Sequence, residues 1–314
     1  MPAAGRRMGS APWAEKASTN VITSALPLVP PQAPPTIQDV RPGRALVGWM
    51  NPAQAYGLLQ RGTVPAAVTA AAERARRAVA ARTPGVEQAA VVGAVPDDLA
   101  AHLSALEASP AARPMYAEGW QVALVDLSRV CAFQPSVVTD QSIARVQAVD
   151  ETDLGSIAAV TLPLTQGDVL PFQYDPIHRA WTVSSANPNV RVAAQVGPLP
   201  VSPAGMALGF AVTAGPSYMQ VGCYRGRHYL RDGYHRAFGL LSRGITTVPA
   251  FVRDIGAFEE LVPDPRTMLP QDGYLGERPP VLADYLDEEV SAAVQLPPVR
   301  KMVIIQALEL APIG

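Results

Sequence analysis

The chain has 314 residues, of which 48% are hydrophobic, so it is long and apolar enough to bury a sizeable core in one large domain or two modest ones. Its formal net charge of −2 excludes the broad basic surface typical of nucleic-acid-binding proteins, and we expect no nucleic-acid partner. Two cysteines are too few for a disulfide framework, and no apolar run approaches the roughly 20 residues that cross a bilayer, so we expect a cytoplasmic protein without a membrane partner.

Residues 1–42 have little to bury. They are rich in proline, alanine, serine and threonine, and prolines crowd between Pro27 and Pro35. Because proline interrupts helices and the segment lacks large apolar residues in a regular pattern, we expect an extended or disordered leader. Binding of a protein partner through this leader stays open.

Residues 43–118 are predicted to be a helical N-terminal region. A proline lies at or just before the start of each expected helix, where it is tolerated. Short apolar runs indicate two strands. The expected helices are 51–59, 65–82 and 97–108, and the expected strands are 45–50 and 88–95.

Residues 119–260 are predicted to be the main domain. It begins with a strand at 120–125, after which residues 136–219 have the pattern of strands and turns. Four apolar segments parted by Gly-Asp, Asp-Pro and Asn-Pro-Asn turns indicate a small β-sheet inserted at about 155–200. These expected strands are 158–164, 169–174, 180–184 and 190–195.

The stretch 220–252 is predicted to be a strand, turn, strand, helix, strand unit. Two runs rich in Val, Tyr and Leu, 220–224 and 228–231, are separated by three residues, the length of a hairpin loop. A helix is expected from Tyr234, with Gly244 at its left-handed end. An apolar strand follows at 248–252.

The junction between the hairpin and this helix predicts an anion site. The first turn of a helix carries amides without partners and the positive end of the helix dipole. Cationic side chains gather there, and arginine offers a planar, two-pronged donor for a phosphate or carboxylate. The candidate binding residues are Arg225, Arg227, Arg231, Asp232, Gly233, Tyr234, His235 and Arg236.

A structural interpretation of the same junction stays open. In it the hairpin arginines are solvated surface residues, and Asp232-Gly233 is a simple turn with a helix cap. Cys223 precedes His228 by five residues, but strand alternation favours a buried small side chain over a nucleophile. The histidines and cysteines lack the spacing of metal ligands, so we expect no structural zinc and no other metal site.

Residues 261–314 are predicted to be a C-terminal extension. An acidic helix with a solvated face is expected at 281–293, followed by a strand at 299–309. Because that strand is strongly apolar, we expect it inside a sheet or at the interface of a homo-oligomer.

The residues across the junction resemble the second conserved box of the ParB/sulfiredoxin superfamily. In this box a strand runs through a glycine into a helix with basic residues, and a G-x-x-x-V-P-x-x-V strand follows. A weaker resemblance to the first box covers 122–135. The matching positions are Asp232, Gly233, His235, Arg236, Ala237, Gly244, Val248, Pro249 and Val252, and in the first box Val125, Leu127, Val130, Gln134 and Pro135.

The resemblance implies an α+β fold with a mixed sheet, here carrying the inserted β-sheet and the N-terminal helical extension. In sulfiredoxins a catalytic cysteine follows the glycine, and Tyr234 at this position excludes that repair chemistry. ParB CTPases and related serine kinases use the box to hold nucleotide phosphates, which implies a nucleotide with Mg²⁺ as the ligand. No catalytic acid can be assigned, and Asp126 and Asp140 are guesses.

Three functions follow from these observations. The first is binding of a nucleotide or another phosphate-bearing small molecule, with nucleotide hydrolysis or small-molecule phosphorylation left open. The second is a non-catalytic structural or protein-interaction role that retains the fold. The third, a DNA-associated ParB-like protein, loses weight because residues 253–314 lack a helix-turn-helix pattern and the isoelectric point is about 6.1.

Overall fold

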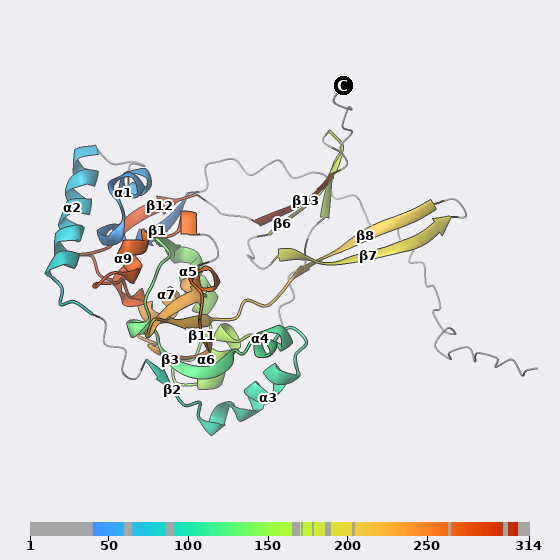
Figure 1. The fold of residues 1–314 in the computed structure, drawn as a ribbon, viewed down its shortest axis with the longest axis horizontal. Helices are drawn as coiled ribbons and strands as arrows, with labels where there is room; N and C mark the ends of the chain where they lie inside the picture. Colours follow the sequence, from blue (N-terminus) through green and yellow to red (C-terminus); the bar gives the residue numbers. More distant parts are fainter. Residues whose placement is uncertain are drawn as a thin grey trace, which may run out of the picture. The chain divides into compact units, whose positions relative to one another are not determined.

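A computed structural model describes the chain at residues 40–59, 65–85, 91–164, 170, 172–177, 179–185, 190–202, 205–262, 265–297 and 301–306. These residues form a mixed α+β structure with four β-sheets, as the predicted fold class requires (Figure 1). All of them lie in the larger of the two units into which the chain divides, Ala33–Gly314. No helix in these ranges combines the length and apolarity needed to cross a membrane.

A five-stranded sheet carries the residues of the predicted site. Its strand order is β10-β9-β11-β3-β2. β9 and β10 form the predicted antiparallel hairpin, while β11 runs parallel to β9 and antiparallel to β3. The bounds are β2 (Val92–Gly93), β3 (Gln121–Asp126), β9 (Gln220–Tyr224), β10 (Arg227–Asp232) and β11 (Thr247–Asp254).

The hairpin loop is shorter than predicted. It consists of Arg225 and Gly226, because Arg227 already pairs with Tyr224 in the ladder. Both loop residues have positive φ, 51° and 74°, which is the backbone geometry of a type I′ turn. Such a turn matches the twist of the two strands and therefore fixes their register.

A three-stranded sheet joins segments that are far apart in the sequence. β1 (Arg41–Ala45) lies at its centre and pairs antiparallel with both β12 (Ala292–Leu296) and β4 (Ser136–Val138). The predicted leader at 1–42 therefore ends before residue 41, and its residues up to 39 lie outside the described ranges. Residues of the N-terminal region, the main domain and the C-terminal extension meet in this sheet.

The prediction of an acidic helix at 281–293 is wrong. Only a 3-10 turn, Leu282–Tyr285, forms there, and the chain then enters β12. The reason lies in Asp284, whose carboxylate accepts from the amide of Val281 at 2.8 Å and pairs with Arg82 at 2.9 Å. This carboxylate is buried and serves an internal ion pair, so one of the acidic side chains on which the helix prediction depended does not face solvent.

Three of the four α-helices described in the N-terminal region lie close to their predicted ranges, and the fourth, at Arg113–Ala117, was not predicted. Asn51 caps the first of them by accepting from the amide of Gln54 (2.9 Å), and Gln54 accepts in return from the amide of Asn51 (3.3 Å). α2 buries Ala72 and Ala75 on one side. The bounds are α1 (Pro52–Leu59), α2 (Pro65–Ala81), α3 (Ala100–Ala108) and α4 (Arg113–Ala117).

Two helices occupy a region where strands were predicted. α5 (Thr139–Val146) and α6 (Leu154–Thr161) replace the expected strand at 158–164 and the turns before it. Asp153 caps α6 by accepting from the amide of Gly155 at 2.8 Å. The apolar run at 157–160 carries no clear period, and a buried helix cannot be separated from a buried strand by such a run alone.

The inserted β-structure starts later than predicted and includes the final strand. β5 (Phe172–Asp175), β6 (Ala180–Ser185) and β13 (Lys301–Gln306) form an antiparallel sheet in the order β13-β6-β5. β7 (Val190–Ser202) and β8 (Gly205–Ala214) form a separate hairpin. The terminal strand therefore pairs with β6, as part of a sheet, but lies at its edge rather than inside it.

Three further helices follow β10, and the core gathers around the first of them. They are α7 (Tyr234–Ser242), α8 (Phe258–Leu261) and α9 (Gln271–Leu275). Large buried aromatic side chains fill the interior, among them Trp120, Tyr229, Tyr274 and Tyr285. α7 packs directly on α5, so the start of α7 is held by segments from several parts of the chain.

Candidate functional site

α7 begins without a side-chain cap. β10 enters it through Gly233, whose φ of 108° lies in a region that glycine adopts far more readily than other residues. Asp232 does not cap the helix, and its carboxylate accepts instead from the Ser217 hydroxyl at 3.3 Å. Within the described part of the chain, no acceptor meets the first three amides of α7. The positive end of the helix is therefore uncompensated by a cap.

Arg236, a predicted ligand-binding residue, is committed to internal partners. It is only 6% exposed, and its guanidinium donates to the carbonyl of Val160 (3.1 Å), to the carbonyl of Ser217 and to the Ser217 hydroxyl (2.9 Å). The Oδ1 atom of Asp232 lies 3.9 Å from Nη2 of Arg236. Burial lowers the pKa of Arg236, and the Asp232 carboxylate opposes that shift. Arg236 thus ties α7 to the end of α6 and to the segment before β9 rather than facing a ligand.

Tyr234 is a core residue. Its hydroxyl accepts from the amide of Phe133 at 3.0 Å, and its ring meets the Phe133 ring edge-on at 5.8 Å. Burial raises the pKa of this hydroxyl well above its ordinary value. The side chain is only 5% exposed, so the predicted site can use the main chain of Tyr234 but not its phenol.

The hairpin arginines also have structural partners. Arg227 donates from Nη1 to two carbonyls at the end of α9, at 3.2 and 2.6 Å. Arg231 donates to the Gln220 side chain at 3.0 Å and lies over the Trp120 ring. Arg225 stacks over the neighbouring tyrosine ring, with 5.1 Å to the centroid. Arg227 and Arg231 are therefore partly buried and engaged within the protein, and the binding of an anion by the hairpin arginines stays a prediction.

His235 and Arg145 remain as ionisable side chains beside the open end of α7. Neither has a hydrogen bond or an ion pair with another described residue, and Arg145 is exposed near the end of α5. Burial, together with the nearby guanidinium groups of Arg145 and Arg236, lowers the pKa of His235 to about 4. At neutral pH the imidazole is therefore uncharged, and a bound anion would favour its protonated form.

The depressed pKa of His235 makes the fold sensitive to mild acid. Between the unfolded value of about 6.5 and the folded value of about 4, the unfolded chain binds a proton that the folded chain does not. Stability is therefore complete above about pH 6.5 and falls below it, by about 1 kcal/mol at pH 6. Urea unfolding of the wild type and of His235→Asn between pH 5 and 8 measures how the free energy of unfolding depends on pH. The variant should lose the part of this pH dependence that His235 causes. An unchanged slope would contradict the assignment.

The two carboxylates considered as catalytic bases are used locally. Asp126 accepts from the amide (3.0 Å) and the hydroxyl (2.6 Å) of Ser128, closing the turn after β3. Asp140 pairs with Arg41 at 3.1 Å on the surface. Both contacts have evident structural roles, and neither supports a function as a general base.

Cys223 does not form a reactive pair with His228. The ladder places His228 on one side of Cys223 and Asp254 on the other. Burial and the Asp254 carboxylate raise the pKa of the thiol, whereas burial lowers the pKa of His228. Both groups are therefore neutral near pH 7, which disfavours a thiolate nucleophile. Cys223 is partly exposed, whereas the sequence pattern had indicated a buried side chain.

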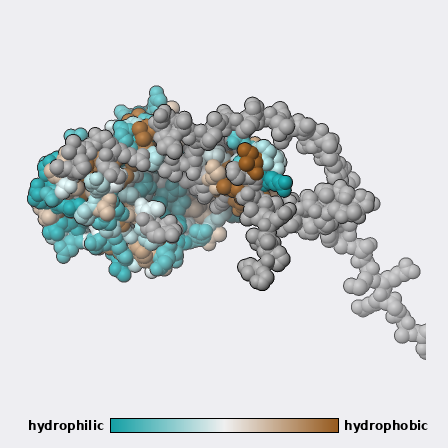
Figure 2. Space-filling view, turned by 90° about the horizontal axis from the view of Figure 1, so that it is seen from above, coloured by the Kyte–Doolittle hydropathy of each residue, from teal (hydrophilic) through white to brown (hydrophobic). Residues whose placement is uncertain are grey.

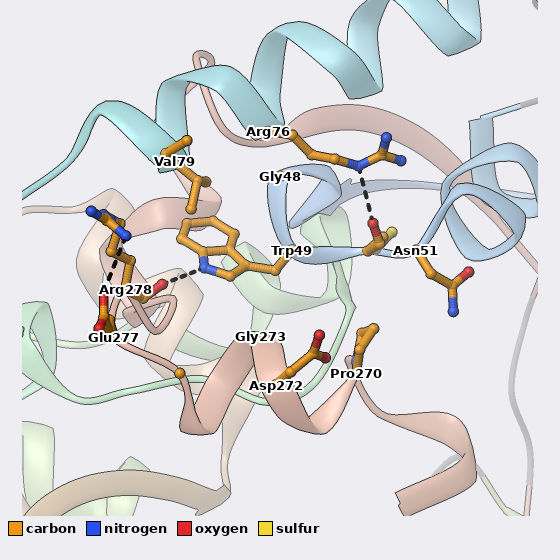
Figure 3. A pocket seen from close by; sticks show the side chains of 13 residues that line it. Gly48, Trp49, Asn51, Arg76, Val79, Pro270, Asp272, Gly273, Glu277 and Arg278 are labelled. Carbon is orange, nitrogen blue, oxygen red and sulfur yellow. Dashed lines mark hydrogen bonds and ion pairs between the residues drawn. The ribbon is translucent and has the colours of Figure 1, made fainter. Parts of the chain in front are cut away.

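A cleft of about 440 Å³ lies between α2 and α9, and none of the predicted site residues is among those that line it (Figure 3). The Trp49 indole forms part of its wall and donates to the carbonyl of Arg278 at 2.6 Å. Arg76 from α2 and Asp272 from α9 bring charges of opposite sign to its rim. This lining suits a small polar molecule, and it lacks a nucleophile and base in hydrogen-bond contact.

Sequence reasoning missed Arg145, and the comparisons add no further residue. Arg145 lies in α5, which was not predicted, so its position beside α7 could not be derived from local patterns. Across the described ranges, no three His, Cys, Asp or Glu residues are grouped so that they could hold a metal ion. No protein-family model, curated protein or solved structure matched the chain.

Proposed function

We propose that this protein binds a phosphate-bearing small molecule at the start of α7, with a nucleotide and Mg²⁺ as the first candidate. The observation that carries the proposal is the uncapped first turn of α7, whose amides lack acceptors among the described residues. His235 and Arg145 stand beside it without an acidic partner. Free amides, a helix dipole and the adjacent Arg145 guanidinium together favour a phosphate.

The proposal includes a ParB/sulfiredoxin-like fold for the unit from β9 to β11. It is supported by the tight hairpin, the left-handed glycine before α7 and the return of the chain as a strand parallel to β9. It is also supported by the helices between the two boxes, since compact members of that superfamily are largely helical there. The site residues within this fold are Arg145, Gly233 and His235, while Arg236 holds the scaffold.

We propose binding without assigning a reaction. A hydrolase or a kinase needs a carboxylate placed to act on water or a hydroxyl, and the two candidates, Asp126 and Asp140, are engaged elsewhere. The mechanism of binding is electrostatic. The amides at the helix start and the Arg145 guanidinium receive the phosphate oxygens, and His235 takes up a proton as the anion arrives.

Arg145→Ala is expected to weaken this binding without unfolding the protein, because the side chain is exposed and has no structural partner. Thermal shift and calorimetric titration with CTP, ATP, GTP and ADP, each with Mg²⁺, measure the effect. A ligand at about 100 times its dissociation constant stabilises the fold by about 2.7 kcal/mol, and the variant should lose most of this shift.

Arg77→Ala is the matched control, since Arg77 is also an exposed helical arginine but lies in α2. Its titration should equal that of the wild type. If both variants lost nucleotide stabilisation equally, net charge alone would explain the effect, and this result would contradict the proposed site. Absence of stabilisation by any of the four nucleotides would favour the non-catalytic, protein-interaction function instead.

A further inference from the structure

Exposed large apolar side chains concentrate on the β13-β6-β5 sheet and its β5–β6 turn. On the face shown in Figure 2, most of the described residues are hydrophilic and hydrophobic residues gather in a few small areas. Almost half of the exposed large apolar residues in the described part of the chain belong to this one small sheet and turn. They are Phe172 (48% exposed), Tyr174 (41%), Ile177 (86%), Trp181 (48%), Met302 (55%) and Ile304 (56%).

The strand register places three of these residues, Phe172, Tyr174 and Trp181, on one face of the sheet, which we call the aromatic face. Phe172 lies opposite Val183, and Tyr174 lies opposite Trp181, so alternation puts all four on the same side. The rings of Tyr174 and Trp181 are 5.1 Å apart. Val303 and Ile305 of β13 extend the face, since they pair with Val183 and Trp181. Val183 at its centre is already buried.

The aromatic face carries no ionisable side chain except at its margin. Each of the six residues that define it, Phe172, Tyr174, Trp181, Val183, Val303 and Ile305, is apolar or aromatic. A charged partner would therefore find no counterpart on this face, whereas two copies of the face meet without like-charge repulsion. Aromatic side chains also pair well with one another in tilted and edge-on arrangements.

The size of the aromatic face indicates a weak association. A fully exposed aromatic side chain offers about 150–250 Å², so three that are nearly half exposed offer about 300 Å². Stable interfaces bury about 800 Å² on each partner, whereas patches of about 300–600 Å² on single chains are often functional. An interface centred on this face should therefore dissociate at micromolar concentrations.

We propose that the aromatic face seats against the same face of a second copy of this chain. The two copies are related by a two-fold axis, so that Trp181 and Tyr174 of each subunit contact the corresponding residues of the other. The two small sheets then form a sandwich whose interior consists of these side chains. The resulting dimer is in equilibrium with the monomer.

Sedimentation velocity of the full-length protein over about 5–500 µM tests the proposal. The wild type should show a monomer–dimer equilibrium. Tyr174→Ser should weaken the dimer at least about tenfold. Tyr56→Ser is the matched control, because Tyr56 is 43% exposed in α1, close to the 41% of Tyr174, and it should leave the equilibrium unchanged.

Trp181→Lys provides a second variant that places like charges opposite each other in the dimer, and it should leave a monomer at every concentration. Circular dichroism and thermal unfolding establish that each variant is folded. A wild type that stays monomeric throughout the range overturns the proposal. So does a dimer that survives Tyr174→Ser and Trp181→Lys, or one that Tyr56→Ser weakens equally.

Discussion

Replacing Arg236 with methionine is expected to lower the free energy of unfolding by about 3–5 kcal/mol, a large share of the stability of an ordinary domain. The substitution removes a guanidinium that satisfies the carbonyls of Val160 and Ser217 and the Ser217 hydroxyl. Each buried acceptor left without a donor costs about 1–3 kcal/mol, and methionine supplies no replacement. Urea unfolding followed by circular dichroism measures the loss.

Arg145→Met is the control for this prediction. Arg145 lies near Arg236 but is exposed and has no partner among the described residues, so its replacement should change stability by less than about 0.5 kcal/mol. Arg236→Lys should also be strongly destabilising, because one ammonium group cannot reproduce the forked contacts. If Arg236→Met were as mild as Arg145→Met, the structural role of Arg236 would be refuted.

Gly239→Ala is expected to destabilise the protein by about 1–2 kcal/mol, although alanine is the better helix former. A methyl group at Gly239 in α7 would overlap the carbonyl oxygen of Ser142 in α5, and it would lie 2.9 Å from a methyl of Val146. The clash with a backbone atom cannot be relieved by rotating a side chain, so α5 must move away from α7. Thermal or urea unfolding reports the change.

Gly57→Ala is expected to raise the free energy of unfolding rather than lower it, and it serves as the matched control. Gly57 lies inside α1, and an added methyl there would meet nothing within 4 Å. The substitution should therefore stabilise the protein by up to about 1 kcal/mol through helix propensity alone. Two variants that both gain stability would mean that α5 and α7 are not in the close contact described here.

The hairpin, α7 and β11 were predictable because their signals are local. A two-strand alternation, a glycine before a helix and a Val-Pro strand are each written within a few neighbouring residues, such as Gly233 and Pro249. α6 was missed because the apolar run after Leu154 has no clear period, and only its capping by Asp153 distinguishes a helix. The inserted sheet was predicted, but its boundary was placed too early.

The candidate site was harder to predict because its content depends on distant partners. The sequence placed five cationic or donor side chains near one helix start, but it could not show that Arg227 and Arg236 donate to carbonyls 48 and 76 residues away. Arg145 reaches the same helix start from α5, which local patterns did not reveal. Charge density in the sequence therefore indicated where the cationic side chains cluster but not which partners they contact.

The central position of β1 has a consequence for cooperativity. This strand binds β4 on one side and β12 on the other, so it holds a segment from near residue 41, one from near 137 and one from near 294 in a single hydrogen-bonded ladder. A fragment cut at 119–260 would keep β4 but lose β1 and β12, its two partners in that sheet, and with them the α9 carbonyls that receive Arg227. The smallest autonomous folding unit is therefore expected to be longer than the main domain predicted at 119–260.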